Sequence, residues 1–116
     1  MGLQIYAGKG FDTQKAERFF KERRVGYQRV DVLRFGIGKR ELESVAAAVG
    51  VEALCDRESK AFRESVIAYT QSRETILSGL MEKPQLLRLP IVRNGKKATV
   101  GDCPDVWEKW IADGIK

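Results

Sequence analysis

The chain has 116 residues, of which 43% are hydrophobic and 32% charged. A chain of this size and composition can bury one hydrophobic core, so we expect a single domain over residues 1–116 and not a disordered chain. No stretch approaches the roughly 18 consecutive apolar residues of a membrane span, and the first ten residues are too polar for a signal peptide. We therefore expect a cytoplasmic protein without membrane contact.

The net charge is +5, and the chain contains no histidine. The positive residues are spread along the chain instead of forming a basic run, so we expect a solvated surface or an acidic protein partner and no direct binding of nucleic acid. Without histidine, the usual general base and the commonest metal ligand are missing. We expect neither a metal site nor a cofactor.

The first part of the chain predicts a β-α-β unit. Residues 3–6 have strand character and end in a flexible loop, after which Asp12 or Thr13 can cap a helix. This helix carries an apolar face made of Ala16, Phe19 and Phe20. A second strand is predicted at residues 27–32, parallel to the first because a helix connects them.

The middle of the chain predicts several helices. The strongest pattern has apolar residues at positions i, i+3, i+4 and i+7, namely Leu42, Val45, Ala46 and Val49, with Gly50 as the stop. Residues 51–55 predict one helical turn, and residues 59–69 another with Phe62, Val66 and Tyr69 on one side. Ser72 is expected to cap a further helix that ends before Pro84.

The last part of the chain predicts a β-hairpin and a closing helix. Asn94-Gly95 separates two strand candidates, and this dipeptide is the strongest short hairpin signal. Pro104 suits the first turn of the closing helix, whose apolar face is expected to contain Val106, Trp107, Trp110 and Ile111. The element order fits an α/β fold with a four-stranded mixed sheet and helices on both faces.

The order of elements and three sequence runs resemble the arsenate reductase/Spx (ArsC-like) family of thioredoxin-fold proteins. The runs are residues 13–16 (TQKA) after Ile5-Tyr6, residues 57–63 (RESKAFR) and residues 82–92 (EKPQLLRLPIV). The resemblance covers nearly the whole chain and implies a thioredoxin-like fold with a helical insertion. It also implies that Pro90 is a cis-proline that faces the redox loop.

This chain departs from the family pattern at four positions. The family's catalytic cysteine corresponds to Phe11, and the second cysteine of its CxxC members corresponds to Gln14. Two arginines of the arsenate reductases correspond to Leu89, directly before Pro90, and to Cys103. Because phenylalanine has no nucleophilic atom, the sequence predicts a degenerate site without a catalytic residue.

Two further readings of this region remain open. The segment Gly8-Lys9-Gly10 precedes a helix N-terminus, which favours anions, and Lys15 adds positive charge. With Arg88 and Pro90, these residues are candidates for a small-anion or thiol-peptide cleft. The alternative is an ordinary strand-to-helix turn, in which Asp12 would oppose an anion.

The two cysteines, Cys55 and Cys103, are separated by 47 residues and are expected to be free thiols. Cys103 precedes Pro104 at a helix start, where a thiol pKa can be lowered, although Asp102 and Asp105 disfavour a thiolate. Cys103 is either a displaced reactive thiol or an unreactive helix cap. For Cys55 we expect a buried packing role.

The resemblance and the departures together predict a non-catalytic member of the family that acts by binding a partner or by regulation. Spx-type relatives bind RNA polymerase, so RNA polymerase is the partner that the resemblance suggests. One alternative is a thiol oxidoreductase that uses Cys103 or Cys55. The other is a small-anion or thiol-peptide binding domain.

Overall fold

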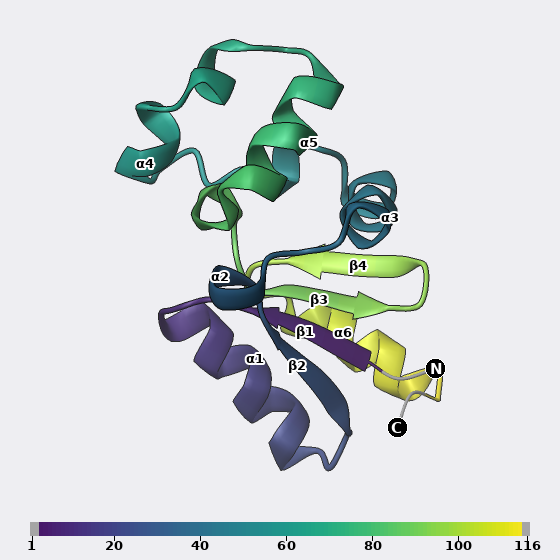
Figure 1. Cartoon of the computed structure of the whole chain (residues 1–116). Coiled ribbons are helices and arrows are strands. Elements are labelled where there is room, and N and C mark those ends of the chain that lie inside the picture. Colours follow the sequence, from purple (N-terminus) through teal and green to yellow (C-terminus); the bar gives the residue numbers. More distant parts are fainter. Residues whose placement is uncertain (1–2, 115–116) are drawn as a thin grey trace.

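The computed structural model describes residues 3–114, which form one mixed four-stranded sheet with helices on both faces (Figure 1). The strand order is β2-β1-β3-β4, with β1 parallel to β2 and antiparallel to β3. The strands are β1 (Leu3–Ala7), β2 (Tyr27–Asp31), β3 (Ile91–Asn94) and β4 (Lys97–Val100). The predicted β-α-β unit, the hairpin and the mixed sheet are confirmed.

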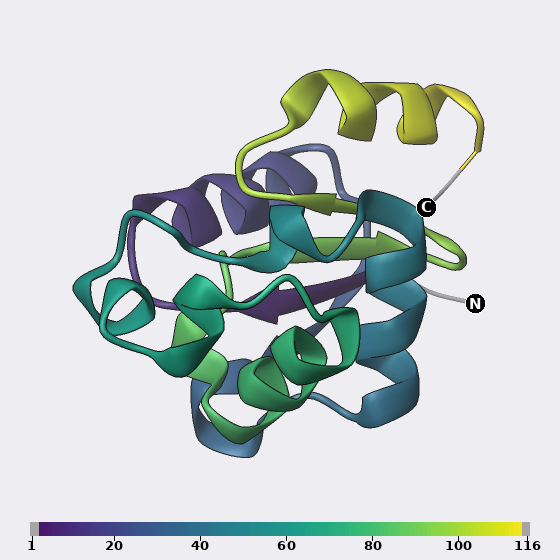
Figure 2. The ribbon, with the colours of Figure 1, turned by 90° about the horizontal axis from the view of Figure 1, so that it is seen from above.

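The helices divide between the two faces of the sheet (Figure 2). The helices are α1 (Phe11–Glu22), α2 (Val32–Phe35), α3 (Lys39–Val49), α4 (Lys60–Arg63), α5 (Arg73–Glu82) and α6 (Pro104–Ala112), with 3-10 turns η1 (Glu52–Leu54), η2 (Val66–Tyr69) and η3 (Pro84–Leu86). Helices α1 and α6 cover one face, and the insertion between β2 and β3 covers the other. Each face therefore has its own buried cluster.

The cluster under α1 and α6 is built on aromatic rings. Phe20 and Trp107 are buried with ring centroids 5.4 Å apart, and the indole N–H of Trp107 donates to the Thr99 hydroxyl at 2.8 Å. The prediction that Trp107 and Trp110 are core residues is confirmed. Val106 was placed wrongly on this face: its side chain is 37% exposed, and the helix turns the two tryptophans inward instead.

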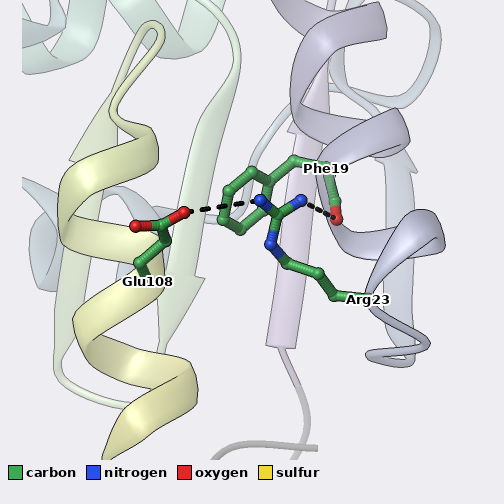
Figure 3. A network of polar contacts seen from close by, with 3 residues as sticks. All are labelled: Phe19, Arg23 and Glu108. Carbon is green, nitrogen blue, oxygen red and sulfur yellow. Dashed lines mark hydrogen bonds and ion pairs between the residues drawn. The ribbon is translucent and has the colours of Figure 1, made fainter.

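A polar clamp joins α1 to α6 at the edge of this cluster (Figure 3). The guanidinium of Arg23 lies 3.7 Å from the centroid of the Phe19 ring and donates to the Phe19 carbonyl. It also reaches Glu108 of α6 at 3.4 Å. The guanidinium of Arg23 thus covers the Phe19 ring and is held in place by the carboxylate of Glu108 on the neighbouring helix.

The N-terminus of α1 differs from the prediction. The helix begins at Phe11, and Gly10 occupies the N-cap position with a φ of 114°, a value that favours glycine. Neither Asp12 nor Thr13 is the cap, because both lie inside the first turn. The hydroxyl of Thr13 is buried and accepts a hydrogen bond from the Gly8 N–H at 3.1 Å.

The insertion contains the largest error of the sequence prediction. Residues 59–69 split into α4 and η2 instead of forming one helical segment, and Phe62 does not share a side with Val66 and Tyr69. Phe62 is buried, whereas Val66 is 83% and Tyr69 86% exposed. Ile67 is the residue of η2 that packs into the core. The predicted caps at Ser72 and Gly50 are confirmed.

The hairpin turn is displaced by one residue from the prediction. Its two central residues are Gly95 and Lys96, and only Gly95 has a positive φ, at 62°. Asn94 is the last residue of β3 and pairs with Lys97. A glycine at the first central position is the requirement of a type II′ turn, so the glycine and not the asparagine decides the turn.

Of the helices described, none is both long and apolar enough to cross a membrane.

Candidate functional site

The loop between β1 and α1 lies directly against the segment that enters β3. A Cβ atom added to Gly8 would stand 2.7 Å from Cδ1 and 2.9 Å from Cβ of Leu89. The Leu89–Pro90 peptide bond is cis, as the family resemblance implies. The Pro90 carbonyl accepts from the Gly101 N–H at 2.9 Å, which ties this segment to the end of β4.

Phe11 and Gln14 both lie in the first turn of α1 and are exposed. Phe11 is 80% exposed, so its ring is not a packing residue of the core. Its place at the start of a twelve-residue helix is where the dipole would stabilise a thiolate if a cysteine stood there. The ring of Phe11 has no ionisable group that the helix dipole could stabilise.

The anion groups proposed from the sequence are partly engaged within the protein. The Gly8 N–H donates to the Thr13 hydroxyl, and the Lys15 ammonium lies 3.9 Å from the Asp102 carboxylate. This ion pair bridges the start of α1 and the loop before α6. Gly10 and Lys9 stay exposed. Lys9 therefore remains available to an anion near the helix start, whereas the Gly8 N–H is already engaged by Thr13.

Arg88 lies between the two cysteine regions. Its guanidinium lies over Gly101, where an added Cβ would be 3.3 Å from Nη2. Arg88 also lines a hollow of about 300 Å³ together with Cys55 and Arg57. The structure thus sets Leu89 against Gly8 and brings Arg88 close to Gly101 and within electrostatic reach of Cys103. Cys55 is not brought to the Gly8 loop and shares only the hollow beside Arg88.

Cys103 occupies the N-cap position of α6, but its side chain does not cap the helix. Its thiol donates instead to the Val100 carbonyl at 3.4 Å. Burial raises the pKa of the Cys103 thiol and Asp102 raises it further, whereas Arg88 lowers it. The net direction is upward, which opposes a reactive thiolate at neutral pH.

Cys55 is buried, and its thiol donates to the Val51 carbonyl at 3.5 Å. Burial raises the pKa of this thiol, and Arg57 only partly opposes the effect. This agrees with the expected packing role. Within residues 3–114, no group of three or more His, Cys, Asp and Glu side chains is arranged to hold a metal ion.

A second hollow beside the same loop was missed by the sequence analysis. It has a volume of about 430 Å³ and is lined by Gly8, Lys9, Arg29, Asp31, Leu33 and Arg34. These residues come from the β1–α1 loop, β2 and α2. The parallel register, which sets Ala7 opposite Asp31, brings the ends of β1 and β2 together. Lys9 was the only one of the three cations that the sequence analysis singled out.

The chain was compared with known proteins. Residues 11–110 match the model of the ArsC family. The structure resembles an arsenate reductase from Vibrio cholerae, with a TM-score of 0.83 at 20% identity over 94% of this chain and 97% of that chain. It also resembles a putative ArsC family related protein from Bacteroides fragilis, with a TM-score of 0.81 at 21% identity over 94% and 98% of the two chains.

An arsenate reductase related protein from Brucella melitensis has a TM-score of 0.68 at 23% identity, over 96% of this chain and 95% of that chain. At these identities the likeness establishes the thioredoxin-like fold, and the family model establishes the family. No curated protein sequence matches the chain. Since the family model spans most of the chain and the fold agrees with it, the protein belongs to the ArsC family.

Proposed function

We propose that this protein is a non-catalytic ArsC-family protein that acts by binding a protein partner. The observation that carries the proposal is Phe11, an exposed aromatic ring at the helix start where the family resemblance expects the attacking sulfur. A thiol-based reductase needs a thiolate at this position to attack its substrate. The scaffold remains, but the group that begins the chemistry is absent.

The two remaining thiols do not replace that group well. The pKa values of Cys55 and Cys103 are both raised, mainly by burial, so the thiolate fraction of each is reduced at neutral pH. Cys55 is also 5% exposed, too little for a large substrate to reach its sulfur. These features argue against the alternative of a thiol oxidoreductase that uses either cysteine.

Exposed apolar side chains support a binding role. Among the described residues, three of them are Phe11 at the start of α1 and Leu33 and Phe35 of α2. Single exposed apolar residues are common on soluble proteins, but aromatic rings with most of their surface in water are typical anchors of interfaces. RNA polymerase is the partner class that the Spx resemblance suggests.

Two measurements test the proposal together. Reduction of arsenate and of a disulfide substrate, with thioredoxin or glutathione as the reductant, is compared between the wild type and a Cys55→Ser/Cys103→Ser variant. We expect no turnover from either protein. Thiol-dependent turnover by the wild type would instead support the oxidoreductase alternative.

The second measurement is capture of a partner from cell extract by the immobilised protein. We expect enrichment of a defined protein that is reduced by Phe11→Ser, because the ring leaves the surface while the fold is untouched. Exchange of an equally exposed aromatic, Tyr69→Ser, serves as the matched control for the other face of the molecule. Recovery of nothing above the bead background would contradict a partner-binding role.

A further inference from the structure

The hollow beside the β1–α1 loop is positively charged. We call the surface lined by Gly8, Lys9, Arg29, Asp31, Leu33 and Arg34 the basic hollow. Three side-chain cations, from Lys9, Arg29 and Arg34, face a single lining carboxylate, Asp31. The basic hollow therefore carries an excess of positive charge on a protein whose net charge is already +5.

The cations of the basic hollow differ in how far they are neutralised. Arg29 is paired with Glu17 of α1, with 3.3 Å between Nε and Oε1. Asp31 accepts a hydrogen bond from the backbone N–H of Arg34 at 3.3 Å, as the cap of α2. Within residues 3–114, neither Lys9 nor Arg34 makes an ion pair. These two side chains are the ones available to an incoming anionic group.

Apolar side chains border the same surface. Leu33 lines the basic hollow and is 37% exposed. Phe35 follows Arg34, whose guanidinium lies 5.1 Å from the centroid of its exposed ring. Phe11 begins α1 two residues after Lys9. A ligand in the basic hollow would therefore meet cations and exposed hydrocarbon together.

We propose that the basic hollow binds an acidic peptide segment of a protein partner, with carboxylates at Lys9 and Arg34 and an apolar side chain against Leu33 and Phe35. This inference rests on the proposed partner-binding function and assigns its surface. Charge complementarity favours an acidic occupant, because paired potentials steer association and reject basic segments. The hydrocarbon border favours a segment that also has apolar side chains.

A nucleic acid fits this surface less well than a peptide. Only two unpaired cations are available, whereas nucleic-acid surfaces neutralise a row of phosphates.

The test uses a short synthetic peptide in which glutamate alternates with leucine and phenylalanine, and a matched peptide with glutamine in place of glutamate. Both are titrated into isotope-labelled protein. We expect saturable chemical-shift changes centred on Lys9, Leu33 and Arg34. The glutamine peptide should bind about five- to tenfold more weakly, as the loss of two exposed charge pairs implies.

Two charge-reversal variants separate a specific surface from general attraction. Lys9→Glu/Arg34→Glu changes the basic hollow, and Lys96→Glu/Lys97→Glu makes the same change of net charge, from +5 to +1, at the other end of the sheet. Lys97 pairs with Asn94, which lies opposite Leu3 at the start of β1, whereas Lys9 follows the end of β1. We expect peptide binding to be lost in the first variant and unchanged within about twofold in the second.

Several results would overturn the assignment. Equal weakening in both variants would mean general electrostatic attraction, and shift changes centred on η2 would move the site to another face. Tighter binding of a single-stranded RNA oligonucleotide than of the peptide, at the same residues, would make the surface a nucleic-acid site.

The inference and the proposed function fail in different ways. If the wild type captures a partner from extract and Lys9→Glu/Arg34→Glu captures it equally well, partner binding stands and the basic hollow is not its surface. If the wild type captures no partner but the acidic peptide binds at Lys9 and Arg34, the surface chemistry is supported and the proposed cellular role is not.

Discussion

Gly8 stands against Leu89, the residue before cis-Pro90, so closely that no side chain fits between the loop and the hairpin. An added Cβ would be 2.9 Å from the Cβ of Leu89, an atom that cannot rotate away. We expect Gly8→Ala to lower the free energy of unfolding by about 1–3 kcal/mol, the usual range for overpacking. Urea unfolding measures this loss.

Gly26→Ala is the matched control for this change. Gly26 has no atom within 4 Å of an added Cβ. The same substitution there should leave stability unchanged or raise it by up to about 1 kcal/mol, because it restricts the unfolded chain. Equal effects of the two substitutions would mean that the contact with Leu89 does not constrain the loop.

A second close approach fixes the insertion. An added Cβ at Gly79 of α5 would be 2.5 Å from Cγ2 of Ile67, the buried residue of η2. Alanine gains about 1 kcal/mol over glycine inside a helix, but overpacking costs about 1–3 kcal/mol. We expect Gly79→Ala to destabilise the protein on balance.

Whether Gly79→Ala destabilises or stabilises the protein should depend on the side chain at position 67. With Ile67→Ala, the obstructing methyl group is absent, so Gly79→Ala should become neutral or stabilising relative to Ile67→Ala alone. A thermodynamic cycle of the four proteins measures the coupling. Additive effects would contradict the contact between η2 and α5.

The same contact explains why the insertion was the part of the fold least accessible to sequence reasoning. The apolar spacing of residues 62, 66 and 69 is helical, but Ser59 and Ser65 are the N-cap residues of two separate elements, α4 and η2. In η2 it is Ile67 that packs inward, against Gly79 of α5. Where these elements begin and which of their residues is buried depend on tertiary packing between α5 and η2. The sheet and α3 were predictable because their periodicity and turn residues are local signals.

The degenerate site that we propose was suggested by the sequence only through the family pattern, and the basic hollow was not noticed at all. Lys9 lies 20 residues before Arg29 and 25 before Arg34, so in the sequence the three look like scattered surface charges. The parallel pairing of β1 with β2 brings them together, since it sets Ala7 opposite Asp31. The predicted β-α-β unit already implied this meeting of strand ends, so the signal was present.

Alkaline pH should weaken the fold through Tyr6. Burial and a 2.6 Å hydrogen bond from its hydroxyl to Glu41 raise the pKa of Tyr6 from 10.0 to about 12. The folded protein holds this proton more tightly than the unfolded chain, so the stabilisation is complete below pH 10 and is lost as the pH rises toward 12. Tyr6→Phe should reduce the slope of stability against pH in this window.

The measurement is urea unfolding at a series of pH values in the Cys55→Ser/Cys103→Ser background, because the raised pKa values of both thiols act in the same direction. Tyr27 has a pKa that is also raised to about 12, so Tyr27→Phe is the matched variant and the double variant should be flatter than either. An unchanged slope in Tyr6→Phe would contradict the role of its hydrogen bond to Glu41.

The reactivity of Cys103 should respond to its two charged neighbours in opposite directions. Asp102 raises the pKa of this thiol and Arg88 lowers it. In a Cys55→Ser background, Asp102→Asn should shift the pH dependence of alkylation to lower pH, and Arg88→Gln should shift it to higher pH. If both variants label like the parent, the thiol does not sense either charge, and burial alone controls its reactivity.

Replacement of Phe11 tests whether the scaffold still provides the environment of a redox loop. In the Cys55→Ser/Cys103→Ser background, Phe11→Cys puts a thiol at the N-terminus of the twelve-residue α1. Phe35→Cys is the matched control, because Phe35 is similarly exposed but ends α2, where the dipole has the opposite sign. The thiol at position 11 should alkylate about two- to fivefold faster at neutral pH, as helix-terminus effects on a pKa imply.

Arsenate reduction is not expected from the same Phe11→Cys variant. Leu89 and Cys103 stand where the family resemblance places oxyanion-binding arginines, and Lys15 is held by Asp102. A thiol without these cations can be activated by the helix and still fail to bind an oxyanion. Turnover by Phe11→Cys alone would show that the rest of the site is intact, whereas slow alkylation equal to that of Phe35→Cys would show that the start of α1 no longer activates a thiol.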